Sequence, residues 1–231
     1  MTRSASDIPR RARPSKKRLR TASGPAANKP PHRLGLPVSR RVKPLDQTPL
    51  VLTVGHSTRT LKDFVALLLA HGVKQLIDVR TIPRSRHNPQ FNQGRLPRPL
   101  QKAGINYRHA AGLGGLRHAR RDSTNTAWKN ASFRGFADYM QTPEFEKALD
   151  QLIHWAQKRR TVIMCAEAVP WRCHRSMIGD ALLARGIRVE EIASRSRKRP
   201  HTLTPWALVR RKRVSYPASL KRSKAVGRKA A

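Results

Sequence analysis

The sequence predicts one α/β domain over about residues 50–217, with a mostly parallel β-sheet between two layers of helices. Three observations support this fold class. Short apolar runs rich in β-branched residues recur along the chain at the length of buried strands. Segments with apolar residues at helical spacing separate these runs. Each connection is long enough for the right-handed crossover that parallel strands require.

The first predicted strand and helix have the clearest boundaries. The run LVLTV at residues 50–54 stops at Gly55, as a buried strand does at a turn. Apolar residues then repeat at helical spacing over residues 61–69, and Gly72 ends that helix. The candidates for its N-cap are Ser57, Thr58 and Thr60.

The middle of the domain continues the alternation. Residues 73–79 (VKQLIDV) and 105–109 (INYRH) indicate the second and third strands. Between them, prolines predict a loop over residues 83–99, and a short helix follows near residues 100–103. A long polar loop opens after the third strand with Gly112, Gly114 and Gly115.

The last part of the domain has the strongest patterns. Residues 133–140 and 143–158 indicate helices, and Thr142 and Pro143 suit the cap and the first position of the second one. Residues 161–166 (TVIMCA) indicate a buried strand. A helix at 174–184, a strand at 188–193 and a hairpin at 201–217 complete the domain. These elements predict a Rossmann-like three-layer sandwich followed by a C-terminal hairpin.

Positive charge is concentrated at both ends of the chain. The formal net charge is +36; residues 1–50 hold 13 Lys and Arg against two acids, and residues 194–231 hold 13 against none. The arm 1–48 and the tail 218–231 lack apolar periodicity, so we expect both to be disordered. Basic arms attract polyanions through counterion release, which makes nucleic acid the expected partner unless the arms are merely solvated.

Cysteine usage and hydropathy indicate a soluble, cytoplasmic protein. Two cysteines, Cys165 and Cys173, are too few for a secreted disulfide scaffold, so we expect a reducing setting. No apolar run reaches the roughly 18 residues that cross a bilayer, so no membrane partner is expected. Prolines in the N-terminal arm argue against an amphipathic transit peptide.

Polar side chains follow three of the predicted strands, at the edge where open α/β sheets bind ligands. They are His56 and Ser57 at the end of the first strand, Asp78, Arg80 and Arg84 at and beyond the end of the second, and Cys165 and Glu167 at the end of the strand over residues 161–166. Because the carboxyl ends of parallel strands meet at one edge, we expect these side chains to converge on one pocket.

The segment 165–175 (CAEAVPWRCHR) is the richest candidate site. A helix N-terminus lowers the pKa of a thiol and binds anions through its free N–H groups. We therefore expect Cys173 to act as nucleophile, Glu167 as general acid or base, and His56 or His174 to adjust the protonation of the thiol. The expected anion-binding residues are Ser57, Arg80, Arg84 and Arg175, and the expected supporting residues are Asp78, Cys165 and His174.

Each of these residues also has a structural interpretation. Cys165 fits a buried strand end, Cys173 a helix cap, and Arg175 an ion-pair partner. Ser57 fits a helix N-cap, and Asp78 can pair with a neighbouring arginine to hold its loop.

A metal site built on both cysteines with His174 or His56 is a further alternative. The cysteine spacing fits no compact zinc pattern, so no metal is predicted. The sequence identifies no cofactor.

Several motifs together resemble the bacterial family of domain of unknown function 488. They are TVGHS at 53–57, DVRTIPRSRHNPQF at 78–91, LGG at 113–115, WKNASFRGFADYMQTPEF at 128–145, MCAEAVPWRCHRSMIGDALLARG at 164–186 and HTLTPWALV at 201–209. The resemblance covers about residues 51–217 and implies a small α/β fold of bacterial, cytoplasmic origin. It implies that the ten candidate residues are motif positions, and it assigns no activity to them.

Three classes of function remain open on these grounds. The first is an enzyme or binding domain for an anionic ligand, such as a nucleotide or a nucleic-acid end, at the strand ends. The second is a non-catalytic nucleic-acid-binding protein that uses its basic arms. The third is a thiol-redox or metal-dependent protein.

Overall fold

The computed structural model describes residues 49–218, so the arm 1–48 and the tail beyond Ala218 lie outside the described residues. Within this part, one sheet has the strand order β3-β2-β4-β1-β5-β6. Its parallel strands are β1 (Leu50–Gly55), β2 (Gln75–Asp78), β3 (Asn106–His109), β4 (Thr161–Cys165) and β5 (Arg188–Ile192). Strand β6 (Lys198–Pro200) runs antiparallel to β5. The predicted mostly parallel sheet is confirmed.

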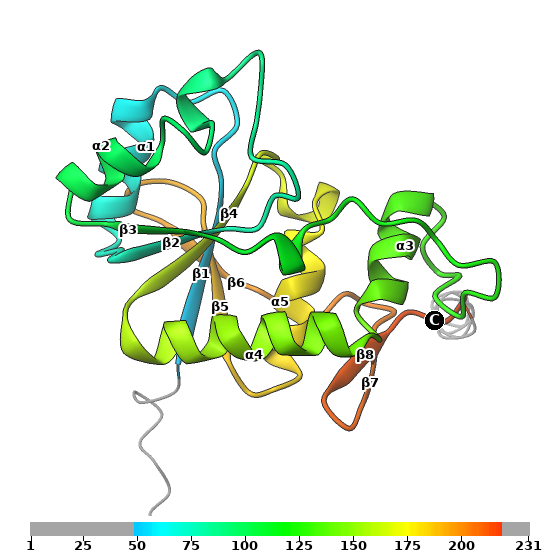
Figure 1. Cartoon of the computed structure of the whole chain (residues 1–231). Coiled ribbons are helices and arrows are strands. Elements are labelled where there is room, and N and C mark those ends of the chain that lie inside the picture. The colour runs from blue at the N-terminus through cyan, green and yellow to red at the C-terminus, as the bar shows by residue number, and fades with distance from the viewer. Residues whose placement is uncertain (1–48, 219–231) are drawn as a thin grey trace, which may run out of the picture. The chain divides into compact units, whose positions relative to one another are not determined.

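Helices cover both faces of this sheet (Figure 1). Helices α1 (Leu61–Ala70) and α2 (Pro97–Lys102) pack on one face, and α3 (Ala131–Tyr139), α4 (Pro143–Lys158) and α5 (Arg175–Leu183) pack on the other. Successive strand residues point to opposite faces of the sheet. Val51 therefore packs in the core under α3, α4 and α5, and Leu52 packs in the core under α1 and α2. The three-layer architecture expected from the sequence is therefore present.

Three helices begin at side-chain caps, which accept hydrogen bonds from backbone N–H groups of the first turn. The caps are Thr60 for α1, Asn130 for α3 and Thr142 for α4. The cap at Asn130 starts α3 two residues before the predicted boundary. Because Thr60 caps α1, the interpretation of Ser57 as the N-cap is wrong.

The segment predicted as a loop over residues 83–99 is partly helical. Pro97 is the first residue of α2 and Pro99 lies in its first turn, where a backbone N–H has no partner within the helix. Short 3-10 helices, which the sequence did not predict, are η2 (Pro89–Phe91), η3 (Ala111–Leu113) and η4 (Pro170–Arg172). Strand β6 was also missed, because its residues KRP show neither apolar alternation nor strand propensity.

The predicted C-terminal hairpin is formed by β7 (Leu208–Arg210) and β8 (Arg213–Ser215). Its turn residues Arg211 and Lys212 have φ angles of 48° and 68°, the left-handed backbone that a two-residue hairpin turn requires. Tyr216 follows β8, and its buried hydroxyl donates to Asp180 Oδ2 on α5 over 2.9 Å. This bond attaches the end of the hairpin to the sandwich.

Among residues 49–218, no helix has both the length and the apolar composition needed to cross a membrane. Helix α4 is 16 residues long and carries acidic residues in its first turn.

Candidate functional site

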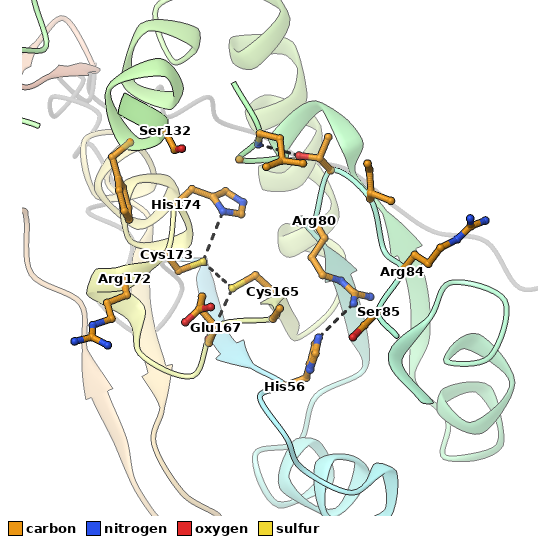
Figure 2. Close-up of a pocket in the computed structure, with 16 residues that line it drawn as sticks. His56, Arg80, Arg84, Ser85, Ser132, Cys165, Glu167, Arg172, Cys173 and His174 are labelled. Atoms are coloured by element: carbon orange, nitrogen blue, oxygen red, sulfur yellow. Dashed lines mark hydrogen bonds between the residues drawn. The ribbon is translucent and has the colours of Figure 1, made fainter. Parts of the chain in front are cut away.

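The carboxyl ends of β1, β2 and β4 lie side by side, because β4 pairs with both other strands. Backbone bonds continue this pairing beyond the strands: His56 N donates to Cys165 O, and Val79 N donates to Met164 O, each over 3.0 Å. A cavity of about 390 Å³ opens at this edge (Figure 2). The predicted convergence of the three strand ends is therefore found.

Most of the predicted site residues line the cavity. Those that do are His56, Arg80, Arg84, Cys165, Glu167, Cys173 and His174. Asp78 and Arg175 do not line it, but each contacts a residue that does. Ser57 also lies outside the lining, and its carbonyl oxygen is 2.8 Å from His56 Nδ1.

The two thiols meet at the floor of the cavity. Cys165 ends β4 and Cys173 precedes α5, and their sulfur atoms are 2.7 Å apart. Both residues are buried, with exposed fractions of 2% and 4%, yet both contribute to the cavity wall. No disulfide joins them. The site thus contains two thiols in direct contact.

Arg175 is the first residue of α5 and lies behind the thiol pair. Only 1% of its surface is exposed, and its Nη1 donates to Cys165 Sγ over 2.7 Å and to Glu167 O over 3.1 Å. Its Nε and Nη2 atoms are buried without a hydrogen-bond partner among residues 49–218. Within the same residues no carboxylate forms an ion pair with it. A buried guanidinium stays charged, so the Cys165 sulfur is the nearest group that can neutralise it.

The two thiols differ in acidity because of this arrangement. The hydrogen bond from Cys173 lowers the pKa of Cys165, and the charge of Arg175 lowers it further, while burial opposes both. The same sulfur contact, together with burial, raises the pKa of Cys173 well above its usual value. Cys165 is therefore the more acidic thiol of the pair, and Cys173 the less acidic one.

The imidazole of His174 contacts the Cys173 sulfur. Its Nε2 donates to Val79 O over 3.0 Å, which leaves Nδ1 as an acceptor 3.6 Å from Cys173 Sγ. Burial lowers the pKa of His174 to about 4, so the ring is neutral near pH 7. A Cβ on Gly115 would lie 2.5 Å from His174 Nδ1, so only glycine allows this close approach.

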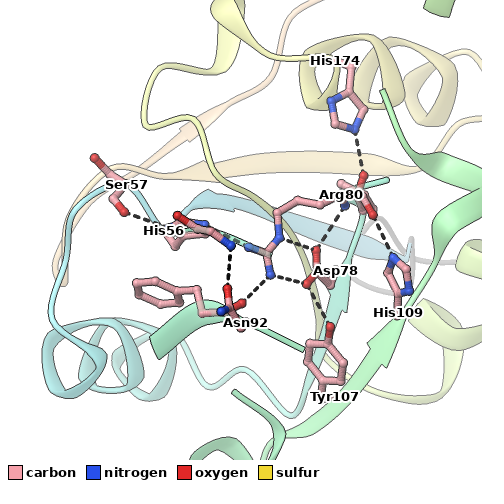
Figure 3. A network of polar contacts seen from close by, with 11 residues as sticks. His56, Ser57, Asp78, Arg80, Asn92, Tyr107, His109 and His174 are labelled. Atoms are coloured by element: carbon pink, nitrogen blue, oxygen red, sulfur yellow. Dashed lines mark hydrogen bonds and ion pairs between the residues drawn. The ribbon is translucent and has the colours of Figure 1, made fainter. Parts of the chain in front are cut away.

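Figure 3 shows a second polar network on the β2 side of the cavity. Asp78 accepts from Arg80 Nε over 2.9 Å and from Arg80 Nη2 over 2.6 Å, and the Tyr107 hydroxyl donates to it over 2.9 Å. The ion pair suggested by the structural interpretation of Asp78 is thus present. Arg80 Nη2 also donates to Phe91 O over 2.6 Å.

His56 connects this network to β1. Its Nδ1 donates to Ser57 O, so Nε2 is the acceptor that faces Arg80 Nη1 at 3.3 Å. Burial lowers the pKa of His56 to about 4, and the Arg80 charge contributes. His56 stacks on Phe91 with 4.1 Å between ring centroids. It is a neutral, fixed ring that supports Arg80.

The rim of the cavity combines free positive charge with exposed apolar surface. Among residues 49–218, no side-chain hydrogen bond or ion pair holds the guanidinium groups of Arg84 and Arg172. Ile82 and Leu116 lie at the same rim with exposed fractions of 63% and 68%. Such a rim favours a ligand that carries both an anionic and an apolar or aromatic group.

Sequence reasoning omitted several lining residues. They are Thr81, Ile82, Ser85, Leu116, Ser132 and Ala166. The run Gly112-Leu-Gly-Gly115 was a usable signal for this side of the pocket, because adjacent glycines often mark close approach of the backbone to another group.

The described residues contain no group of three His, Cys, Asp or Glu side chains placed to hold a metal ion. The softest potential metal ligands in the cavity are the two thiols and the neutral imidazole of His174.

Comparison with known proteins gives one result. A family model described as "Domain of unknown function DUF488" matches residues 60–182, which is more than half of the chain. No curated protein and no solved structure matches the chain. The matched range contains all the residues that line the cavity except His56.

Proposed function

The chain belongs to the family described as domain of unknown function DUF488, and from its site we propose an enzyme in which the Cys165 thiolate attacks a small anionic ligand. The observation that carries this proposal is the 2.7 Å contact of buried Arg175 with Cys165 Sγ. A guanidinium without a carboxylate partner is costly inside a protein unless another anion neutralises it. A thiolate at that position meets this need and is also the reactive form of cysteine.

The roles of the two cysteines follow from their contacts. We assign the nucleophile to Cys165, in place of the Cys173 expected from the sequence, since Arg175 Nη1 donates to the Cys165 sulfur and the Cys173 sulfur lies 2.7 Å from it. Cys173 is then the donor that stabilises the thiolate. A thiolate of this kind persists in a reducing compartment, which fits a cytoplasmic location.

The ligand is held by charges at the rim. Arg84 and Arg172 are exposed and free to bind an anionic group. Arg80 offers at most one N–H of its Nη1, because Asp78 and Phe91 O hold Nε and Nη2 and His56 Nε2 lies 3.3 Å from Nη1. The exposed Ile82 and Leu116 suit an apolar or aromatic part of the same ligand, such as the base of a nucleotide.

The proposed reaction is a displacement in which the Cys165 sulfur is the nucleophile, followed by hydrolysis. The electron pair of Cys165 Sγ forms a bond to an electrophilic atom of the ligand, and the leaving group departs with its own bonding pair and takes a proton from solvent. Water then displaces the sulfur as thiolate. The exposed Glu167 carboxylate accepts the proton of that water.

A pair of alkylating probes tests this proposal. Iodoacetate is anionic and iodoacetamide is neutral, so their relative rates at Cys165 report on charge at the rim. We expect iodoacetate to be favoured about fivefold to tenfold relative to its preference for a free cysteine, the size expected for one or two exposed charge pairs. The rates are measured by peptide mass spectrometry on the reduced full-length protein.

Charge variants provide the control. Arg84→Gln combined with Arg172→Gln should remove the preference for iodoacetate and leave the iodoacetamide rate unchanged. Arg98→Gln is the matched control, because Arg98 is exposed on α2 outside the cavity lining. Inorganic phosphate should slow iodoacetate labelling of the wild type. The same preference in the wild type and the double variant would contradict the proposal.

We also propose that the basic arms bind nucleic acid, a role separate from the cavity. Support comes from the 13 Lys and Arg against two acids in residues 1–50 and from the exposed cations Arg210, Arg211, Lys212 and Arg213 at the hairpin. Removing residues 1–48 and 219–231 should abolish most salt-sensitive binding of labelled DNA or RNA. Binding with an unchanged salt slope after both deletions would exclude this role for the arms.

A further inference from the structure

The direct contact between the two thiols gives this site a chemistry beyond displacement. Their sulfur atoms are 2.7 Å apart with nothing between them, against about 2.05 Å in a disulfide. Both sulfurs belong to the wall of the same cavity of about 390 Å³, which is large enough to admit a small oxidant. A modest movement of two side chains is therefore enough to join them.

We propose that hydroperoxides oxidise this pair to an intramolecular disulfide, with Cys165 taking the oxygen atom and Cys173 displacing it. This inference rests on the Cys165 thiolate of the proposed function, and it names a second substrate class for the same site. Cys165 is the attacking sulfur because Arg175 Nη1 and Cys173 both stabilise its anion. Cys173 resolves the product because no other cysteine exists in the chain.

The two steps balance as follows. The Cys165 thiolate attacks the outer oxygen of the hydroperoxide, the O–O bond breaks, and the products are Cys165 sulfenic acid and an alkoxide, which takes a proton to become the alcohol. The Cys173 sulfur then attacks the Cys165 sulfur, and hydroxide leaves. Thiolate, thiol and hydroperoxide thus give one disulfide, one alcohol and one hydroxide ion.

A neighbouring base serves the second step. His174 Nδ1 is an acceptor 3.6 Å from Cys173 Sγ, since Nε2 donates to Val79 O. The neutral ring can take the Cys173 proton while that sulfur attacks and pass it to the departing hydroxide as water. A dithiol such as dithiothreitol reverses the reaction by becoming the oxidised partner.

The oxidation also changes the charge balance behind the thiols. A disulfide carries no negative charge, so Arg175 loses the anion that neutralises it and keeps Glu167 O as its acceptor. Its Nε and Nη2 atoms already lack partners among residues 49–218. A buried cation at the first residue of α5 with no anion in direct contact destabilises the fold, since the Glu191 carboxylate interacts with Arg175 only at longer range. Oxidation of this protein should therefore lower its thermal stability, against the usual effect of a disulfide.

Peroxide treatment of the reduced full-length protein tests the inference. One equivalent of hydrogen peroxide should remove two hydrogen atoms from the intact mass and link the Cys165 and Cys173 peptides, with reversal by dithiothreitol. The Tm should fall by about 5 °C on oxidation and return on reduction. In Arg175→Met oxidation should no longer lower the Tm, because the buried charge is gone and the usual stabilising effect of a disulfide remains.

Trapping with dimedone assigns the order of the steps. Cys173→Ser should accumulate a dimedone adduct on Cys165, and Cys165→Ser should give none on Cys173. If either variant fails to fold, dimedone added to the wild type in the first seconds should label Cys165 first. Labelling of Cys173 first, or conversion of Cys165 to sulfinic acid without a disulfide, would overturn the inference.

The outcomes separate this inference from the proposed function. If Cys165 reacts with iodoacetamide as a thiolate but peroxide forms no disulfide, only the disulfide inference is contradicted. If the disulfide forms but the preference for iodoacetate is the same in the wild type and in the Arg84 and Arg172 double variant, only the anionic-ligand function is contradicted. A Cys165 that reacts with neither probe removes both.

Discussion

Arg175 Nη1 lies 2.7 Å from Cys165 Sγ, and this contact couples a fully buried cation to the thiol at the end of the central strand β4. The groups that face Cys165 Sγ come from two further segments: Cys173 before α5, and the carbonyl of Glu167 in the loop after β4. The reactivity of the site therefore depends on a side chain that no ligand in the cavity touches directly.

Arg175→Met should raise the pKa of Cys165, because it removes the positive charge that stabilises the thiolate. Each unit of increase lowers the thiolate fraction, and thus the labelling rate below the pKa, about tenfold. Iodoacetamide labelling of Cys165 as a function of pH measures this shift. Arg175→Lys should show a smaller shift, and an inflection at the wild-type pH in Arg175→Met would contradict the role assigned to Arg175.

Gly55→Ala should be severely destabilising. A Cβ at this position would lie 1.7 Å from Glu167 O, a backbone atom of the loop that follows β4. We expect a loss of about 3 kcal/mol or more in the free energy of unfolding, measured by urea denaturation. Gly94→Ala is the matched control, since nothing lies within 4 Å of its Cβ, and should stay within about 0.5 kcal/mol of the wild type.

Asp78→Asn should cost more stability than Tyr107→Phe. The first change leaves the Arg80 guanidinium buried without its anion, a loss of about 3–5 kcal/mol. The second removes one hydroxyl donor from the same carboxylate, a loss of about 1 kcal/mol. Equal losses in urea denaturation would show that the Asp78–Arg80 ion pair does not stabilise this loop.

Stability should fall as the pH drops from about 6.5 toward 4. Burial lowers the pKa of both His56 and His174 to about 4 in the folded protein, below the value of 6.5 for an exposed ring. The unfolded chain therefore binds more protons in this interval, so the free energy of unfolding decreases by up to about 1.4 kcal/mol per pH unit for each ring.

Denaturation curves at pH 7, 6 and 5 measure this effect before most carboxylates titrate. His56→Gln should flatten the slope by the share of one ring. His118→Gln is the control, because His118 is exposed. A slope that His56→Gln does not change would assign the pH dependence to other groups.

Much of the fold follows from local pattern. The run TVIMCA predicts the central strand because a segment buried on both faces has no polar alternation to obscure it, and Thr142-Pro143 predicts the start of α4 through cap chemistry. Strand β6 escapes such reasoning because Lys198–Pro200 forms a strand only by pairing with β5. Strand β6 forms because it pairs with β5, although its residues have low strand propensity.

The candidate site shows a similar division. Its location could be predicted, since parallel strands place His56, Asp78 and Cys165 at one edge of the sheet. The burial of Arg175 could not be predicted, because an arginine at a helix start is usually exposed. Sequence spacing also does not show which groups surround that side chain. The acidity order of the two cysteines depends on that burial, and so the sequence favoured Cys173.

The strand order also sets when the pocket can exist during synthesis. β1 and β2 leave the ribosome well before β4, yet they pair with β4 and not with each other. A nascent chain that has not reached Thr161 can pair β2 with β3, but β1 has no link to them and the β2 edge that β4 will occupy is open to non-native pairing. Insertion of β4 joins β1 to the β2–β3 pair and brings Cys165 between His56 and Asp78 in one event, so a chain that fails this step has no site.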